Sequence, residues 1–114
     1  MKYTSEVKQN ILSIQLQGDL IGETNGMELV DLVNDKINES IILCSIDLSQ
    51  VRYMNSSGIG VLITILTKFR NKGGEVVLVS PSEQIKKLLI ITKLNAIFLI
   101  VNSQEEAIQK LNQK

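Results

Sequence analysis

The chain has 114 residues, the length of one domain, and its 44% hydrophobic content is enough to form a core. Lysine and arginine together number 12, as do aspartate and glutamate, so the net charge is zero, which argues against a nucleic-acid binder with a basic patch. Histidine is absent, which excludes a histidine-dependent triad and makes an enzyme less expected. We expect no catalytic residue, no metal site and no cofactor.

The chain also lacks the signals of export or membrane insertion. Its first residues, MKYTSEVKQN, are polar and unlike a signal peptide. Its apolar runs are too short to span a bilayer, and Cys44 has no partner for an intramolecular disulfide. These features predict a soluble cytoplasmic protein. No linker or repeat divides the sequence, so residues 1–114 are expected to form one domain.

Two strands and a helix are predicted in the first third of the chain. Alternating residues predict strands at 3–8 and 11–17, joined by a hairpin turn at 8–10. A loop is expected over the following stretch, GDLIGETNG. A helix is expected over 24–38, because apolar residues recur there at helical spacing, beginning with Met27.

Strands and helices alternate in the remaining sequence. Short, almost wholly apolar segments at 41–48, 75–79 and 97–101 are typical of strands buried on both faces. A connecting loop is expected over SQVRYMN and a helix over 57–71, ending before the pair Gly73-Gly74. The element order predicts an α/β fold with a mixed, mostly parallel sheet, an N-terminal hairpin strand and about four helices.

Two capping boxes predict where the last two helices begin. Ser80 is followed three residues later by Glu83, and Ser103 is followed by Glu106. In such a box the serine hydroxyl accepts a hydrogen bond from the backbone of the first helical turn. We therefore expect Ser80 and Ser103 to be the two N-caps.

The stretch MNSSGIG, residues 54–60, lies just beyond the strand predicted at 41–48, where open α/β sheets usually place their binding sites. A helix N-terminus carries unpaired N–H groups and a partial positive charge. Asn55 or Ser56 can cap it, while Gly58 and Gly60 would leave its first turn bare. An anion, or a phosphate attached to Ser56, would fit there. The plainer alternative is that the polar residues only cap the helix and the glycines only allow close packing.

A longer segment resembles a known family. The run IDLSQVRYMNSSGIGVLITILTKFRNKGGEVVLVSPSEQIKKLLIITKLNAIF, preceded by QLQGDL, is similar to the STAS domain of anti-sigma factor antagonists. The similarity covers nearly the whole chain, and the spacing of NSSGIGVL from Asp47 and from Gly73-Gly74 also fits. This resemblance implies a STAS-like fold throughout.

The resemblance also implies a function. In that family the first serine of the loop is phosphorylated by a partner anti-sigma serine kinase, and here that serine is Ser56. The unphosphorylated form binds the kinase and frees a sigma factor, and a phosphatase resets the switch. The loop and the first helical turns would face the partner, which makes Asn55, Ser56, Ser57, Gly58 and Ile59 the expected contacts.

Two positions depart from the usual family pattern. Asn55 stands where the loop usually has an aspartate, and Ile21 stands where the early Gly-Glu-Leu-Asp pattern ends in one. Among the other acidic residues, Asp47 is expected to orient the following loop by accepting backbone hydrogen bonds. Asp19 and Glu23 are expected to form an acidic rim that faces the partner or the solvent.

Other functions remain open at this point. The domain could be a regulatory or scaffold module with a partner outside sigma-factor control. It could also use the same helix N-terminus to bind a small anion or a nucleotide, although NSSGIGV lacks the Gly-Lys-Ser/Thr ending of a P-loop.

Overall fold

The computed structural model describes residues 2–21 and 24–113 and contains a five-stranded sheet with the order β1-β2-β3-β4-β5. Its strands are β1 (Lys2–Lys8), β2 (Ile11–Leu20), β3 (Leu43–Met54), β4 (Glu75–Val79) and β5 (Leu99–Val101). β1 is antiparallel to β2, and every other neighbouring pair is parallel. The predicted mixed, mostly parallel sheet with an N-terminal hairpin strand is confirmed.

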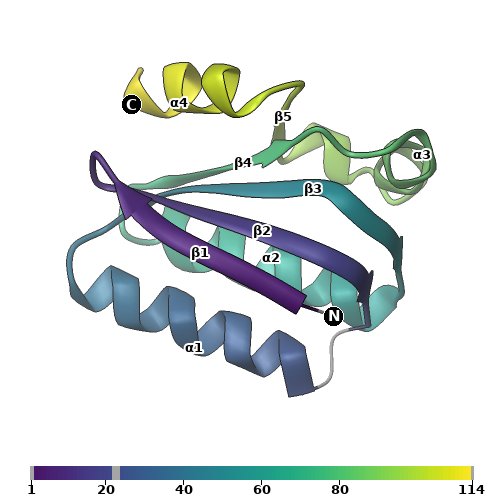
Figure 1. Cartoon of the computed structure of the whole chain (residues 1–114), viewed down its shortest axis with the longest axis horizontal. Helices are drawn as coiled ribbons and strands as arrows, with labels where there is room; N and C mark the ends of the chain where they lie inside the picture. The colour runs from purple at the N-terminus through teal and green to yellow at the C-terminus, as the bar shows by residue number, and fades with distance from the viewer. Residues whose placement is uncertain (1, 22–23, 114) are drawn as a thin grey trace.

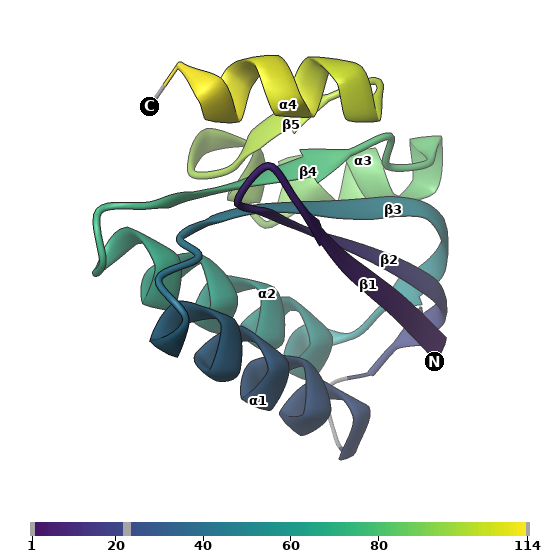
Figure 2. The same cartoon turned by 60° about the vertical axis from the view of Figure 1, so that its left-hand side comes forward.

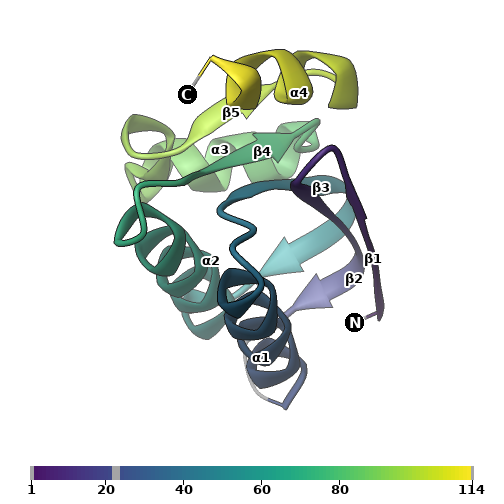
Figure 3. The ribbon, with the colours of Figure 1, turned by 90° about the vertical axis from the view of Figure 1, so that its left-hand side faces the viewer.

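Helices cover both faces of this sheet. They are α1 (Thr24–Asn38), α2 (Ser56–Arg70), α3 (Glu83–Ile91) and α4 (Gln104–Asn112), with a short 3-10 helix at Leu94–Ala96. Figure 1 shows α4 on one side of the sheet and α1 and α2 on the other, and Figure 3 shows the same layers from the side. Within the described residues, none of the helices is long and apolar enough to cross a membrane.

Strand alternation in β2 divides the apolar residues between the two faces. Leu12, Ile14 and Leu16 pack with α1, α2 and α3 in the larger core. Ile11 points the other way and joins the smaller core under α4, which also contains Val77, Val79, Val101, Ala107 and Leu111. The apolar residues 76–79 of β4 follow from this arrangement, because they point alternately into the two cores and helices cover both faces of the strand.

The hairpin and the end of α2 agree with their sequence signals. Gln9 and Asn10 both have positive φ, 56° and 63°, as in the two-residue turn that matches the twist of paired strands. α2 ends at Arg70, and Gly73 follows with φ of 78°. The Gly74 N–H donates to the Phe69 carbonyl at 2.9 Å, which satisfies one of the last carbonyls of the helix.

The two loops predicted at the carboxyl edge of the sheet, GDLIGETNG and SQVRYMN, are partly strand, because β2 and β3 extend further than their apolar segments. Residues 22–23 of the first loop lie outside the described residues. β3 leaves β4 after Asp47, but residues 50–54 continue to pair with residues 17–20 of β2 through two register shifts. The polar run SQVRYM is therefore strand, and so are Gly18 to Leu20. Met27, which was expected to join the apolar stripe of α1, is 69% exposed.

The predicted cap of α3 was also wrong. Ser82 is the N-cap, and its hydroxyl accepts from the Ile85 N–H at 3.3 Å. Ser80 instead has a φ of 51°, and its hydroxyl donates to the Asn102 carbonyl at 2.6 Å, which ties the end of β4 to the end of β5. The second predicted cap is confirmed, because Ser103 accepts from the Glu106 N–H at 3.2 Å.

Candidate functional site

The amino-terminal end of α2 lies at the carboxyl edge of the sheet, where β2 and β3 end side by side (Figure 1). The Asn55 N–H donates to the Leu20 carbonyl at 3.3 Å, so the start of the helix is fixed directly to the end of β2. The expectation that the stretch 54–60 lies at the carboxyl edge is therefore confirmed.

Asn55 is the N-cap of α2, and Ser56 is its first helical residue. The Asn55 backbone is extended, and its Oδ1 accepts from the Gly58 N–H at 2.8 Å. Asn55 is thus the cap among the two candidates, and the Ser56 hydroxyl does not cap the helix. Ser56 and Ser57 are both exposed. In the described part of the chain neither hydroxyl takes part in a hydrogen bond.

The two glycines of this turn face opposite directions. Gly58 is buried, and a Cβ atom built on it would overlap the Leu20 carbonyl, lying 2.8 Å from its carbon. The expectation that Gly58 leaves room for a partner is thus wrong, because this glycine allows α2 to approach the backbone of β2. A Cβ atom on Gly60 would meet nothing within 4 Å. Gly60 is therefore the glycine that keeps the helix surface bare.

The outer surface beside Gly60 is a groove between α1 and α2, which lie next to each other in Figure 2. The groove has a volume of about 430 Å³, and its lining includes Ser57, Gly60, Val61 and Met27. The expectation that Gly60 leaves the first turn bare agrees with this lining. Met27 was instead expected in the buried stripe of its helix, and its exposure depends on the way in which α1 docks beside α2. Ile59, an expected contact, is half-buried and packs against the core.

The first turn of α2 has no acidic residue to compensate its positive end. α3 has Glu83 in its first turn, and α4 has Glu105 and Glu106. A carboxylate in this position stabilises a helix by interacting with its dipole. No carboxylate in the first turn of α2 compensates the positive end of this helix, so a negative group placed there would be stabilised.

The structure places the acidic residues singled out in the sequence in different surroundings. Asp19 lies next to the end of β3 and forms an exposed ion pair with Arg52, with 3.4 Å between Oδ1 and Nε. Asp47 accepts from the Ser49 N–H at 2.8 Å, as expected, although it orients a bend within β3 rather than a loop. Glu23 lies outside the described residues.

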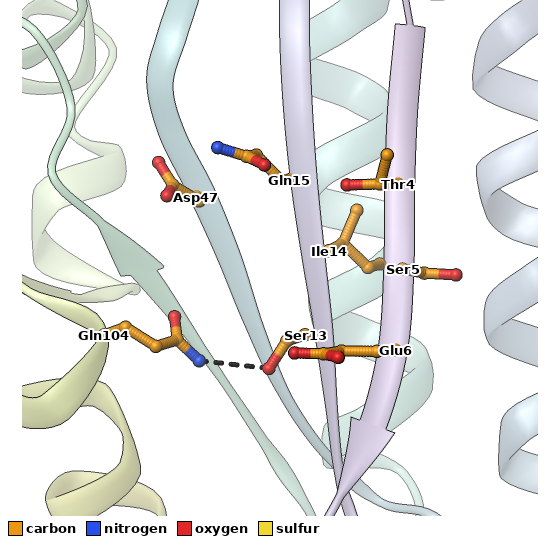
Figure 4. Close-up of a pocket in the computed structure, with 8 residues that line it drawn as sticks. All are labelled: Thr4, Ser5, Glu6, Ser13, Ile14, Gln15, Asp47 and Gln104. Atoms are coloured by element: carbon orange, nitrogen blue, oxygen red, sulfur yellow. Dashed lines mark hydrogen bonds between the residues drawn. The ribbon is translucent and has the colours of Figure 1, made fainter.

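The uncovered part of the sheet beside α4 carries a polar hollow of about 290 Å³ (Figure 4). Gln104 reaches into it from α4, and its Nε2 donates to the hydroxyls of Ser13 and Ser45, both at 3.0 Å. These bonds fasten α4 to β2 and β3. Because its central amide is already engaged in this way, the hollow is better explained by packing than by ligand binding.

Neither a thiol nor a metal centre stands out as a site. Cys44 is fully buried, and this burial strongly raises the pKa of its thiol, so the reactive thiolate is disfavoured. Among the residues that the structure describes, no three acidic, histidine or cysteine side chains come together as a metal site would require.

Comparison with known proteins agrees with this architecture. The chain matches the STAS domain over residues 2–107. The anti-sigma-B factor antagonist of Listeria monocytogenes is 37% identical over 71 residues, which are 62% of this chain and 61% of the relative. The anti-sigma F factor antagonist of Paenibacillus polymyxa is 26% identical over 109 residues, 93% of this chain and 91% of the relative. The chain thus spans about three fifths of the length of several curated relatives, including the Listeria protein.

Solved structures show the same fold. A crystal structure from Thermotoga maritima has a TM-score of 0.87 at 24% identity and covers 96% of this chain and 94% of that chain. The anti-sigma factor antagonist SpoIIAA in its unphosphorylated form has a TM-score of 0.77 at 18% identity, covering 97% and 98%. Phosphorylated Bacillus SpoIIAA has a TM-score of 0.76 at 20% identity, covering 96% and 98%. With a family match across almost its whole length, the chain belongs to the STAS domain family, and its named relatives include anti-sigma factor antagonists.

Proposed function

We propose that this chain is an anti-sigma factor antagonist that binds an anti-sigma serine kinase and is released when that kinase phosphorylates Ser56. A phosphatase would restore the binding form. The observation that carries the proposal is the exposed Ser56 hydroxyl on the first residue of α2, at a helix end without a first-turn carboxylate. The names of the relatives support the partner class, and the two forms of SpoIIAA support phosphorylation as the control.

The geometry favours a phosphate that changes binding without unfolding the protein. Phosphorylation adds about −1.5 to −2 charges near neutral pH. The N-terminal end of α2 would stabilise that charge by about 0.3–1 kcal/mol or more, because its N–H groups point towards it. Asn55 supplies the cap whether or not Ser56 is modified. The phosphate would therefore act at the surface of an intact domain.

Release of the partner follows from the position of Ser56 beside the groove between α1 and α2. A partner lying over Ser57 and Gly60 would have to displace the water around a phosphate on Ser56. This desolvation, and any repulsion from acidic groups of the partner, would weaken binding. A loss of about 3 kcal/mol in binding free energy would weaken affinity roughly a hundredfold, which is sufficient for a switch. Accordingly, the chain is expected to work as a binding regulator and not as an enzyme.

Mapping of the modified serine tests the first step. We would incubate the wild type, Ser56→Ala and Ser57→Ala with the cognate kinase and ATP, followed by peptide mass spectrometry. We expect phosphate on Ser56 in the wild type and in Ser57→Ala, and none in Ser56→Ala. Phosphate mainly on Ser57, or on neither serine, would refute the proposal. Ser57→Ala is a matched control because both hydroxyls are exposed and adjacent.

The effect of charge on binding tests the second step. Ser56→Ala and Ser56→Asp should both fold, because neither touches the Asn55 cap. Ser56→Ala should retain wild-type affinity for the kinase in calorimetry, whereas Ser56→Asp should bind more weakly. Equal affinities of the two variants would remove the main support for a charge switch. Tight binding of phosphate or nucleotide by the free chain in equilibrium dialysis would instead favour an anion-binding module.

A further inference from the structure

α3 carries more apolar surface than its packing on the sheet requires. Ile85 and Leu89, four residues apart, are the side chains of this helix that are buried in the larger core. A second stripe contains Gln84, Lys87, Leu88 and Ile91, at the i, i+3, i+4 and i+7 spacing of one helix face. Ile91 at the end of this stripe is 76% exposed. Leu88 is half-buried against the larger core, while Ile90, the neighbour of Ile91, is 59% exposed. Exposed apolar residues that gather in this way often mark an interaction surface.

The second stripe of α3 lies against the carboxyl part of β3, which adds Tyr53 and Arg52 to the same surface. Figure 1 shows α3 next to this end of the strand. Together Arg52, Tyr53, Gln84, Lys87, Leu88 and Ile91 form what we call the α3 patch. Between them is a largely apolar notch of about 190 Å³, which can receive one large apolar side chain. Tyr53 is 50% exposed, and tyrosine and arginine are the residue types most often central to binding.

The charge around the α3 patch is positive. The segment 83–97 contains three lysines and one glutamate, and that glutamate forms an ion pair with Lys86 at 3.4 Å. Lys87 is exposed on the rim of the notch, and no salt bridge engages it within residues 2–21 and 24–113. Arg52 pairs with Asp19 across an exposed surface, where such pairs are worth no more than about 1 kcal/mol, so another carboxylate can replace Asp19.

We propose that the α3 patch binds an acidic segment of a protein partner, with one large apolar side chain in the notch and carboxylates against Lys87 and Arg52. A concave notch with cations on its rim matches a side chain between acidic neighbours better than it matches a flat lipid surface. The segment 24–39 of a second copy is also acidic, and a head-to-tail contact through it would build rings or chains of molecules, so self-association is measured as an alternative outcome of the test. The proposal stands independently of phosphorylation at Ser56.

A random 12-residue peptide display library is the probe that tests this proposal. We would select peptides on the immobilised protein, synthesise the best binders with a fluorophore and measure their affinity by polarisation. We expect Leu, Ile, Phe or Trp between Asp or Glu residues. Ile91→Ser and Lys87→Glu should each weaken binding by at least about tenfold, as expected for central contacts. Both side chains are exposed, so the variants should fold like the wild type.

Matched controls separate the α3 patch from the rest of the surface. Ile63→Ser removes an exposed apolar side chain from α2, and Lys72→Glu reverses an exposed charge elsewhere. Both variants, and Ser56→Ala, should bind the selected peptides within about twofold of wild type. A basic or uncharged consensus, or binding that survives Ile91→Ser, would overturn the proposal. Two other results would also overturn the proposal if no acidic peptide were selected. One is binding to phosphatidylglycerol vesicles that Ile91→Ser abolishes, and the other is self-association in sedimentation experiments that Ile91→Ser abolishes.

Discussion

The inner and outer faces of the first turns of α2 contain the same kinds of residue, small and polar, but they meet different surroundings. On the inner face Gly58 lies against the Leu20 carbonyl, and the Asn55 side chain caps the helix. On the outer face Ser56, Ser57 and Gly60 are open to solvent or to the groove beside α1. The inner face therefore fixes the helix to the sheet, while the outer face stays accessible.

This difference shows why spacing alone cannot assign a role to a glycine. Gly58 and Gly60 are two residues apart in one helix, so their side-chain directions differ by about 200°. The close approach of β2 occurs on one side only. The same substitution at the two positions should consequently have opposite effects on stability, which gives the sharpest way to test the comparison.

The largest effect is expected for Gly58→Ala. Its new methyl group would overlap the backbone of Leu20, which cannot move as a flexible side chain would. Overpacking of this kind costs about 1–3 kcal/mol or more. Urea unfolding should show a lower midpoint, and labelling of the buried Cys44 thiol should become faster because it reports opening of the core. Wild-type stability together with lost partner binding would mean that Gly58 belongs to the outer face after all.

A smaller loss is expected for Asn55→Ala, which removes the acceptor of the Gly58 N–H. The loss of an N-cap side chain costs about 0.5–2 kcal/mol. The midpoint of thermal unfolding should fall, and Asn55→Ser, which restores an acceptor, should recover most of the difference. If Asn55→Ala and Asn55→Ser melted together at the wild-type temperature, the hydrogen bond in the structure would contribute little to the helix.

Gly60→Ala should stabilise the protein, in contrast to Gly58→Ala. Alanine is a better helix former than glycine by about 1 kcal/mol, and the added methyl group has free space. If Gly60 lies under the partner, the same variant should bind the kinase less tightly although it is more stable. Unfolding and calorimetry on one preparation would measure both. A destabilised Gly60→Ala would contradict the assignment of this residue to the outer face.

The smallest effect on stability is expected for Asn55→Asp, which restores the usual family residue. Asp keeps the cap and adds a negative charge at the helix N-terminus, worth about 0.3–1 kcal/mol. This interaction lowers the pKa of the carboxyl in the folded state below its unfolded value of about 3.9, so the gain is present above that pH and is lost as the pH falls through the folded pKa. Unfolding of both proteins at pH 7 and at acidic pH measures the gain.

Asn55→Asp also tests why this chain has a neutral residue before Ser56. Weaker kinase binding at an unchanged phosphorylation rate would show that Asn55 matches the partner. A slower rate at unchanged affinity would show that the aspartate repels the incoming phosphate. We expect the first result, because a kinase site supplies metal ions that screen phosphate charge.

Much of the fold was predictable because it depends on signals within a few residues. The strand predicted at 75–79 is found as Glu75–Val79, and the Ser103 cap and the turn at Gln9 and Asn10 also agree. Continuous burial, cap chemistry and tolerance of positive φ are local properties of these sequences. The placement of Ser56 at the start of a helix at the carboxyl edge follows from the same local signals and from the family resemblance.

The sequence by itself thus determined the order of strands and helices, the alternation of β2 and the exposed serines at the start of α2. Only the tertiary structure decided that SQVRYM would be a strand, that Ser82 rather than Ser80 would cap α3, and that Gly58 would pack while Gly60 stayed bare. Each of these outcomes depends on a backbone from a distant part of the chain: β2 beside β3, β5 beside Ser80, and Leu20 beside Gly58. Hydrogen bonds and steric contacts between such segments exist only once the sheet has assembled, so no local pattern encodes them.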